Sequence, residues 1–295
     1  MRYFCAYFIT MHNTKPQYLC IGHSCHDKTP NGYILGGTAS YSSIAAKQLG
    51  LAAAVLTSVG KEFLFHDFFK EKNIDFQCIT TKETTVFENI YHNQHRTQYL
   101  HSRAETLLPH HIPTSFLDIP IVQFCPIDDE VDFSLLQQFP NALKGATIQG
   151  WLREWDAQGK ISPKAMDWSQ LSPVNVVILS DADIAGFEYA LPIIANHVNI
   201  VVMTQGKEGA IIFTDNTQYH FPSYPIQEVD ATGAGDVFAA AFLIQYHKTQ
   251  RLDLACAYAH VAASFVVEGV GLNNVQAIDS IQARYEAYQA RFLMV

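Results

Sequence analysis

Short apolar runs alternate with helical patterns along most of the chain, and this alternation constrains the fold more than any other feature. The runs are rich in β-branched residues, as buried strands are, and lie at 18–21, 54–57, 121–124, 147–148, 174–179 and 200–203. Helical patterns lie at 39–49, 62–72, 236–247, 252–267 and 278–292. Strands separated by helices pair in parallel. The sequence therefore predicts an α/β fold with a mostly parallel central sheet covered by helices on both faces.

Residues 74–100 interrupt this alternation. The segment is rich in Thr, Val, Ile, Tyr and Phe and has polar breaks at 82–83 and 92–94. Such a pattern is typical of antiparallel strands joined by turns. A small β-sheet beside an α/β core often forms a lid over a cleft. An ordinary meander at the edge of the main sheet is the alternative.

The composition narrows the possible partners. The net charge is -9, and Lys and Arg are scattered, so we expect no nucleic-acid partner. An acidic chain still binds ATP where backbone amides, helix ends and Mg²⁺ supply positive potential. No apolar run approaches the ~20 residues of a membrane helix, so we expect no membrane span. Six cysteines without a C-x-x-C pair favour reduced thiols and a cytoplasmic location.

The first 17 residues lie before the first expected strand. Their apolar run at 3–9 is not followed by a small-residue cleavage site, which argues against a signal peptide. We interpret 1–17 as an N-terminal extension. Its first ten residues are alternatively an artefact of start-site choice, with Met11 as the true start.

A run of small residues, Thr232-Gly233-Ala234-Gly235-Asp236, stands directly before a strongly apolar helix. Small residues let successive backbone N–H groups face one point with no side chain in the way. At a helix N-terminus these donors and the helix dipole attract an anion. The motif thus predicts a place where negative charge is held while a phosphoryl group moves.

Asp236 lies at the edge of this predicted anion site. We expect the helix dipole to keep its carboxylate ionised, so that it accepts a proton from an attacking hydroxyl as the oxygen–phosphorus bond forms. The alternative role is that of helix N-cap, for which Asp is well suited.

Two further glycine turns accompany this motif. Gly36-Gly37 opens another helix and allows either close backbone approach to a ligand or a hinge between lid and core; a tight loop-to-helix turn is the alternative. The segment 204–209 (TQGKEG) follows the strand at 200–203 and suits contact with a nucleotide phosphate or sugar. It lacks the P-loop spacing, and Rossmann patterns are absent too.

In this order, the three motifs resemble those of the ribokinase/PfkB family of carbohydrate and nucleoside kinases. The likeness runs from about Tyr18 to Asn274 and is most specific at 230–236 (DATGAGD), which matches the family signature. It implies a ribokinase-like kinase domain over 18–275, with a β lid contributed by about 22–36 and 74–102. Residues 276–295 then form a C-terminal helix.

The resemblance also implies roles for single residues. The family's base falls on Asp236, and its anion hole on Gly233, Ala234 and Gly235. The implied substrate contacts are Asp27, Gly36, Gly37, Tyr41 and Arg153. The implied nucleotide contacts are Thr204, Gly206, Gly209, Asp230, Thr232 and His260.

Some of these residues have a plain structural alternative. Without the resemblance, Asp27 reads as a turn residue, Arg153 as a solvated helix arginine and His260 as a buried helix histidine. Tyr41 stands where ribokinases typically carry Asn, which departs from the ribose-specific pattern.

The family places an Asn-x-x-Glu element after the strand at 174–179, where it organises Mg²⁺ and phosphate through water. This chain has Ser180-Asp181-Ala182-Asp183, so the fourth position keeps an acid and the first loses its amide. The resemblance implies ATP and Mg²⁺ as cofactors, with Asp183 acting on the metal indirectly, and it leaves a need for K⁺ open. A helix N-cap role for Ser180 or Asp181 is the alternative.

Two phrases are similar to a sub-branch, the plant myo-inositol kinase-like proteins. Residues 22–27 (GHSCHD) resemble their Gly-Asn-x-Cys-His-Asp, and residues 149–153 (QGWLR) resemble their Gln-Gly-x-x-Arg. We expect ATP-dependent phosphotransfer to a hydroxyl of a small sugar, cyclitol or polyol. We expect the chain to act as a monomer or as a homodimer formed through the β lid.

Three alternatives stay open. One is a nucleoside kinase of the cytidine or adenosine type, with Tyr41, Phe87 and Tyr91 as a stacking surface. Another is a non-catalytic ligand-binding member, which the altered Asn-x-x-Glu element favours. The last is a member that binds a partner protein. The unbroken run from Gly233 to Asp236 favours an active kinase.

Overall fold

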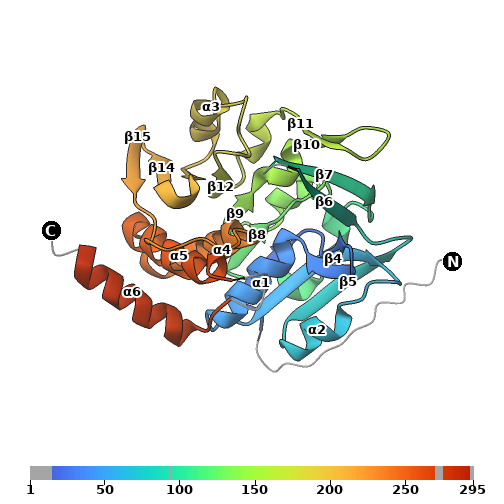
Figure 1. Ribbon diagram of the computed structural model, residues 1–295, viewed down its shortest axis with the longest axis horizontal. Helices are drawn as coiled ribbons and strands as arrows, with labels where there is room; N and C mark the ends of the chain where they lie inside the picture. The colour runs from blue at the N-terminus through green and yellow to red at the C-terminus, as the bar shows by residue number, and fades with distance from the viewer. Residues whose placement is uncertain (1–14, 93–94, 270–274, 293–295) are drawn as a thin grey trace.

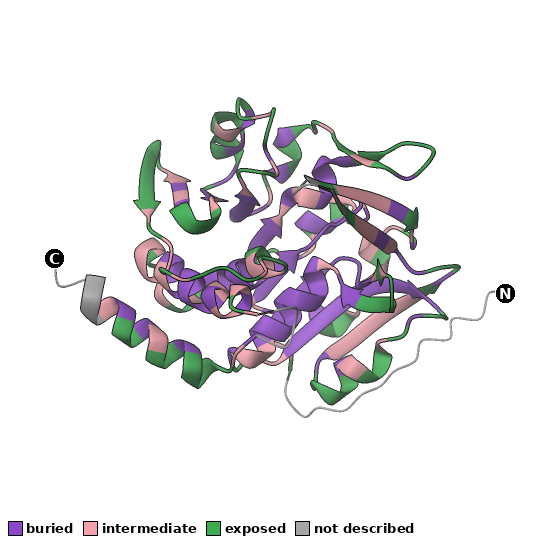
Figure 2. Ribbon diagram, viewed as in Figure 1, coloured by how far each residue is buried: buried purple, intermediate pink, exposed green. Residues whose placement is uncertain are grey.

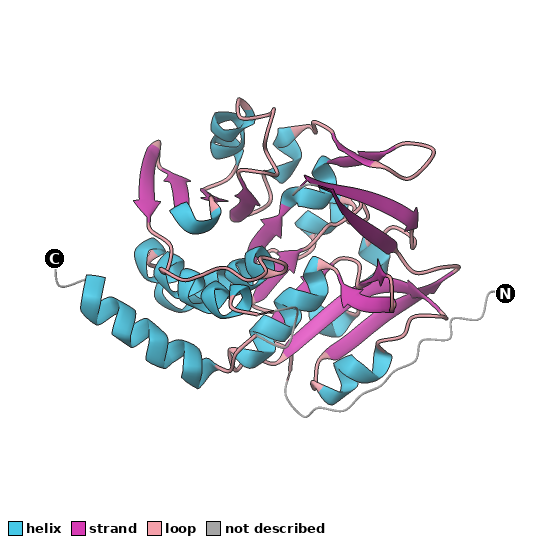
Figure 3. Ribbon diagram, viewed as in Figure 1, coloured by secondary structure: helices cyan, strands magenta, loops and turns pink. Residues whose placement is uncertain are grey.

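A nine-stranded sheet forms the centre of the chain (Figures 1 and 3). The computed structural model describes residues 15–92, 95–269 and 275–292, so expectations for residues 1–14 and for the side chain of Tyr91 lie outside it. The strand order is β15-β14-β13-β12-β9-β8-β1-β4-β5. All neighbours from β13 to β5 pair in parallel, whereas β14 and β15 are antiparallel.

Five of these strands (β1, β4, β8, β12 and β13) coincide with expected apolar runs, whereas no run was expected at β14 or β15. The nine strands are β1 (Tyr18–Ile21), β4 (Ala53–Gly60), β5 (Asp75–Thr81), β8 (Ile121–Phe124), β9 (Leu143–Thr147), β12 (Val176–Ser180), β13 (Ile200–Thr204), β14 (Ala210–Thr214) and β15 (Thr217–Phe221). The expected α/β fold with a mostly parallel sheet is confirmed. The strand expected at 147–148 is wrong, because β9 ends at Thr147 and Ile148 begins a 3₁₀ helix.

Each central strand is buried on both faces because successive side chains enter two different cores. On β1, Tyr18 and Cys20 join one hydrophobic cluster and Leu19 and Ile21 join the other. The first cluster packs α1 (Thr38–Gln48), α4 (Ala234–Thr249) and α5 (Leu252–Val267) on one face, and these helices lie side by side in Figure 1.

The remaining helices frame this core. Helix α6 (Ile278–Phe292) packs on α5, and α2 (His66–Glu71) packs against β5 through Phe69. The other face of the sheet carries α3 (Ala190–His197) and several short 3₁₀ helices. These are η1 (Pro109–His111), η2 (Thr114–Phe116), η3 (Phe133–Gln137), η4 (Ile148–Leu152) and η5 (Trp168–Leu171), with η6 (Gly206–Glu208) following β13. Helix α2 is shorter than the expected 62–72.

A separate four-stranded sheet stands beside the main one, and we call it the lid sheet. Its order is β3-β2-β6-β7, with β2 (Cys25–Thr29), β3 (Gly32–Gly36), β6 (Val86–His92) and β7 (His95–Ser102). The pairs β2–β3 and β6–β7 are antiparallel, whereas β2 and β6 are parallel. Figure 2 shows that it is less buried than the main sheet.

Residues 75–81 do not belong to the lid sheet. They form β5, which pairs in parallel with β4 at the edge of the main sheet. The expectation that the lid begins near 74 is therefore too early by one strand. A short ribbon of β10 (Arg153–Trp155) and β11 (Ile161–Pro163) touches the lid through a bridge between Tyr99 and Lys160.

Two broader expectations concern cysteines and membranes. Cys20, Cys25, Cys78, Cys125 and Cys256 are free thiols in the structure. Within the described ranges, the helices are too short or too polar to cross a membrane.

Candidate active site

The loops that follow β1, β8, β9, β12 and β13 leave the same edge of the sheet, because parallel strands end together. These loops and the lid sheet carry Asp27, Arg153, Asp183 and the segment 204–209. The N-terminus of α4 carries Asp236. Ligands of open α/β sheets bind at this edge. The fold thus places most predicted site residues on one side of the molecule.

Glycine is required at the start of α4. Gly233 is the N-cap residue and has a left-handed φ of 81°. A Cβ on Gly233 would lie 2.2 Å from the ring of Tyr41, whereas a Cβ on Gly235 would meet nothing within 4 Å. The backbone is therefore packed against Tyr41 on one side and open on the other. The open side is where an anion can approach the N–H groups of Gly233 and Gly235, whereas the N–H of Ala234 donates to the Ala231 carbonyl oxygen at 3.1 Å.

Asp236 is the third residue of α4 and does not cap it, since Gly233 holds the N-cap position. The interpretation of Asp236 as an N-cap is therefore wrong. Its backbone carbonyl accepts a hydrogen bond from Ser42 Oγ at 3.1 Å, which fixes the start of α4 to α1. Its carboxylate accepts one from the side chain of Thr38.

Burial raises the pKa of Asp236 to about 7, although the hydroxyl of Thr38 and the charge of Arg153 favour the ionised form. The nearby carboxylates of Asp183 and Asp27 raise it further. We expected the helix dipole to dominate, but desolvation outweighs it. A carboxylate that titrates near neutral pH is well matched to a general base.

Asp27 lies on β2 with its carboxylate against the backbone of β3. A Cβ on Gly36 would lie 2.3 Å from Asp27 Oδ2, and one on Gly37, whose φ is 93°, would lie 2.3 Å from the His23 carbonyl oxygen. Both glycines are thus needed for close approach. Burial raises the pKa of Asp27 to about 6, against the opposing charges of Arg153 and Arg96.

Arg153 begins β10 and is only 9% exposed. Its Nη1 donates to the Ile127 carbonyl at 2.9 Å, and its guanidinium stands 5.8 Å from the centre of the Phe87 ring. Burial lowers its pKa to about 10, which leaves it cationic at neutral pH. The alternative of a solvated helix arginine is therefore wrong.

Asp183 is held by three donors. Ser180 N and Ser180 Oγ both donate to Oδ2 at 2.8 Å, and Gln149 Nε2 donates to Oδ1 at 2.8 Å. Ser180 thus orients the acid three residues on. One acceptor position remains on Oδ1, which fits a hydrogen of a water bound to Mg²⁺.

The expected nucleotide contacts lie at the end of β13, in the η6 turn that follows it, in the loop before α4, and on α5. Thr204 ends β13, and Gly209 has a φ of 101° where a Cβ would lie 2.0 Å from the Phe221 carbonyl oxygen. Gly206 also has a positive φ, of 53°, and Asp230 Oδ1 accepts from Thr232 N at 2.9 Å.

His260 lies on α5 with the centre of its ring 5.0 Å from the centre of the Phe238 ring, in an edge-on arrangement. It is 7% exposed, and its Nε2 has no hydrogen-bond partner. Burial lowers its pKa to about 4, so the ring is neutral. A shallow cavity of about 620 Å³ lies against Tyr246 and Gln250 at the far end of α4 and contains none of these residues.

Two residues of the site were missed from the sequence. Thr38 belongs to the Gly36-Gly37 turn but was not assigned a role, and Gln149 was noted only as part of a resemblance. Both follow a glycine turn or a strand end, positions at which side chains reach an active site.

Comparisons with known proteins agree with this geometry. The sequence profile of the "pfkB family carbohydrate kinase" matches residues 170–278, which include all of α4. Inositol 3-kinase of Arabidopsis thaliana is 24% identical over 273 residues, covering 86% of this chain and 74% of that protein. Cytidine kinase of Thermococcus kodakarensis is 26% identical over 237 residues, covering 76% and 83%.

Solved structures show the same fold. Fructokinase with bound ATP from Xylella fastidiosa superimposes with a TM-score of 0.77 at 17% identity, covering 94% of this chain and 100% of that one. A pyrophosphate-dependent kinase in the ribokinase family, complexed with a pyrophosphate analog and myo-inositol, gives 0.74 at 19% identity, covering 90% and 99%. The chain is therefore similar to the pfkB family of carbohydrate kinases, whose profile it matches over residues 170–278, and it has the ribokinase fold.

Proposed function

We propose that the chain transfers the γ-phosphoryl group of ATP to a hydroxyl of a small sugar, cyclitol or polyol. The observation that carries this proposal is the position of Asp236 in the first turn of α4, with a pKa near 7 and the open backbone of Gly235 beside it. Such a carboxylate is a base suited to neutral pH, and the adjoining amides suit a transferring phosphoryl group.

In the proposed reaction, the substrate oxygen forms a bond to the γ-phosphorus as the bond to the bridging oxygen of ATP breaks, and ADP leaves. Asp236 takes the hydroxyl proton. The N–H groups of Gly233 and Gly235 stabilise charge on the phosphoryl oxygens, and that of Ala234 joins them once it leaves the Ala231 carbonyl oxygen, to which it donates at 3.1 Å. Mg²⁺ would neutralise charge on the phosphates when bound. Asp183 would hold a water of its hydration shell through Oδ1.

Asp27 and Arg153 support a polyhydroxylated acceptor. With a pKa of about 6, Asp27 is mostly ionised at neutral pH and can accept hydrogen bonds from two neighbouring hydroxyls. Arg153 limits the repulsion between Asp27 and Asp236, since its charge opposes the pKa increase of both. The relative named inositol 3-kinase supports a cyclitol in particular.

A nucleoside acceptor is the second candidate, favoured by the similarity to cytidine kinase. A base would need a free aromatic face to stack on. Tyr41 is 4% exposed against Gly233, and Phe87 is 2% exposed beneath Arg153, so neither ring offers such a face. This favours the polyol.

The donor is a separate question. The unpartnered Nε2 of His260 supports ATP, because a buried ring nitrogen gains a partner when an adenine lies against it. Pyrophosphate is the alternative donor, since a structurally similar kinase is pyrophosphate-dependent.

The test is a panel of acceptors (myo-inositol, ribose, fructose, cytidine and adenosine) with ATP or pyrophosphate, Mg²⁺, and with or without K⁺. Products are detected by phosphorus NMR. For the best acceptor, Asp236→Asn should lower kcat by about 10³, and the acceptor KM should change by less than about threefold.

Asp279→Asn is the matched control, because Asp279 also lies in the first turn of a helix but is exposed on α6. It should keep the full rate. Full activity of Asp236→Asn would remove Asp236 as the base. A wild-type protein that binds ATP and acceptor but turns over no pair would instead be a non-catalytic member of the family.

A further inference from the structure

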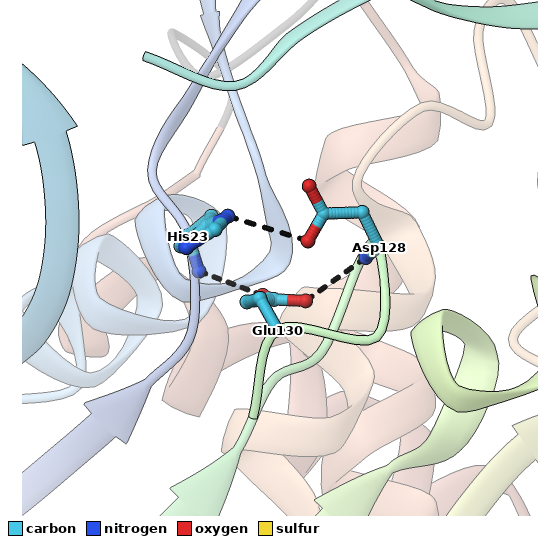
Figure 4. A group of neighbouring side chains, drawn as sticks. All are labelled: His23, Asp128 and Glu130. Carbon is cyan, nitrogen blue, oxygen red and sulfur yellow. Dashed lines mark hydrogen bonds and ion pairs between the residues drawn. The ribbon is translucent and has the colours of Figure 1, made fainter. Parts of the chain in front are cut away.

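His23, Asp128 and Glu130 form a fully buried group of ionisable side chains beside the lid sheet (Figure 4). All three are 0% exposed. His23 lies in the connection between β1 and β2, and the two acids lie in the loop that follows β8. None of the three belongs to the chemistry proposed above. Removing three ionisable side chains from water costs free energy, so we expect their burial to serve a role.

Glu130 joins two of these loops through backbone donors. Its Oε1 accepts from His23 N at 2.8 Å, and its Oε2 accepts from Ile127 N at 2.8 Å and Asp128 N at 2.9 Å. A carboxylate that accepts three backbone N–H bonds is held rigidly. The start of the lid and the loop after β8 are thus tied at one point.

The contacts of the His23 ring accommodate a hydrogen on both of its nitrogens. Nε2 lies 2.7 Å from Ser58 Oγ, whose own hydrogen is donated to the Glu105 carbonyl at 2.5 Å. Nδ1 lies 2.8 Å from Thr85 Oγ1, whose hydrogen is donated to Asp128 Oδ2 at 3.1 Å. With both hydroxyl hydrogens directed at these oxygens, each hydroxyl can accept a hydrogen bond from the ring. This arrangement favours an imidazolium.

The charges around the ring agree with this assignment. Burial alone would lower the pKa of His23, but the carboxylates of Asp128 and Glu130 raise it above the ordinary value. Asp128 Oδ1 lies 3.3 Å from His23 Nδ1. The other charged groups that face the acids are Arg103, with Nε 3.9 Å from Asp128 Oδ1, and Arg153.

The ring sits where the chain passes between the core and the lid. His23 stands two residues before β2, Thr85 stands one residue before β6, and Glu105 follows β7 by three residues. Ser58 belongs to β4 of the main sheet. A single side chain thus contacts two strand entries, one strand exit and the core.

The segment from His23 to Asp27 transmits this anchoring. Cys25 is buried in the lid cluster with Phe87, and His26 accepts a hydrogen bond from Leu64 N at 3.2 Å. The His23 carbonyl oxygen also lies against Gly37, the other end of the lid strand pair. Any movement of His23 therefore moves Asp27 relative to α4.

We propose that His23, as a buried imidazolium paired through its ring with Asp128 and held through its backbone N–H by Glu130, is a positioning residue that fixes the lid at its hinge and sets the place of Asp27. This rests on the proposed role of Asp27 in acceptor binding. A bound metal ion is the competing use of the same three side chains. The hydrogen-bond pattern disfavours it, because both ring nitrogens and both Glu130 oxygens already have partners.

The charge state is tested on the full-length wild-type protein, without reference to activity. Nitrogen-15 NMR of labelled histidines should show one imidazolium that persists at pH 8 and is absent from His23→Asn. His101→Asn is the matched control, because His101 is an exposed lid histidine, and it should leave that signal in place. A neutral His23 ring at pH 7, or stoichiometric metal in the purified protein, would overturn the proposal.

The positioning role is tested by kinetics and hydrogen exchange. His23→Asn should raise the acceptor KM about tenfold or more and the ATP KM less than twofold, with faster amide exchange across residues 25–29. The pair His23→Asn with Asp128→Asn removes one charge of each sign and should recover part of the loss, including folding if the single variant does not fold. Amide exchange at residues 25–29 that is as slow as in the wild type, in both His23→Asn and the double variant, would overturn the positioning role. Fast exchange with an unchanged acceptor KM would instead count against Asp27 as the acceptor contact.

Discussion

At the scale of single residues, burial raises the pKa of Asp236 most, and chain segments far apart in sequence bring two further carboxylates that raise it more. Asp27 comes from the lid sheet and Asp183 from the loop after β12, and both raise the pKa of Asp236. Arg153 opposes both effects. The protonation of the proposed base therefore reports on the assembly of the whole site.

The rate should accordingly depend on pH in the acid range. If Asp236 must be ionised to accept a proton, kcat/KM for the acceptor falls as pH drops through about 7. Below about pH 6, Asp27 also gains a proton, so the slope of log kcat/KM against pH should increase from one toward two. A profile from pH 5 to 9 in constant ionic strength measures this. A rate that stays level between pH 8 and 5.5 would contradict it.

The raised pKa of Asp236 affects stability in the opposite direction to the rate: the rate falls at low pH, whereas stability falls as pH rises. Between about pH 4 and 7 the folded protein keeps a proton on Asp236 that the unfolded chain has lost, so stability decreases as pH rises through this window. Asp236→Asn removes the buried charge. It should therefore be more stable than the wild type at pH 8 by about 1–3 kcal/mol in urea unfolding, and by little at pH 4.

The sequence predicted the identity of these residues better than their protonation state. Asp236 and its glycines stand next to one another, so local pattern revealed them. The helix dipole was also a local argument, and it predicted that the Asp236 carboxylate stays ionised. The burial that opposes it, and the charges of Asp183 and Asp27 that add to that effect, depend on the tertiary fold, as does the hydrogen bond from Thr38 that favours the ionised form.

At the scale of elements, the N-terminus of α4 makes different demands on its two glycines. Gly235 faces open space, so Gly235→Ala should leave stability unchanged or raise it by up to about 1 kcal/mol, as an alanine in a helix does. Its methyl group would occupy the proposed phosphoryl position. We therefore expect kcat to fall by about tenfold or more, measured with the best acceptor.

Gly233→Ala is the contrasting variant. The left-handed φ of 81° and the ring of Tyr41 both oppose a Cβ, so it should lose about 1–3 kcal/mol of stability. Urea unfolding of both variants measures the difference. Equal stability of the two would mean that the backbone at Gly233 is not constrained as the structure indicates.

Elements whose own composition is typical were predicted with nearly correct bounds, and elements defined by a partner were not. β1, β8 and α5 have the bounds that their apolar patterns indicate. β5 was assigned to the lid because its composition matches that of β6, and composition does not identify a pairing partner. β9 was missed at its start because Lys144 and Gly145 are unusual in a buried strand.

Both unusual residues of β9 are explained by the whole molecule. Lys144 Nζ donates to the Leu136 carbonyl at 2.9 Å across the loop layer. Gly145 lies under α4, where a Cβ would stand 2.4 Å from Leu243 Cδ1. The spacing between the sheet and the helix that carries Asp236 is therefore set by a missing side chain in the middle of the sheet.

Restoring that side chain tests the packing of these layers. Gly145→Ala should destabilise the protein by about 1–3 kcal/mol, because a methyl group enters a filled contact. Leu243→Ala should cost about 2–5 kcal/mol, since it leaves a cavity at a fully buried position of α4. In the double variant the new methyl partly fills that cavity, so the loss should be smaller than the sum by at least about 1 kcal/mol.

Urea unfolding of the wild type, the two single variants and the double variant measures this coupling. Gly235→Ala is the control, because Gly235 lies on α4, as Leu243 does, but a Cβ there meets nothing within 4 Å. Coupling should also appear in the chemistry, because a shift of α4 moves Asp236 relative to Asp27 on the separate lid sheet. Gly145→Ala should then lower kcat, and Leu243→Ala added to it should restore part of the rate. Strictly additive stabilities would show that the helix and sheet adjust independently, and the position of Asp236 would then have to be fixed by its contacts with α1 alone.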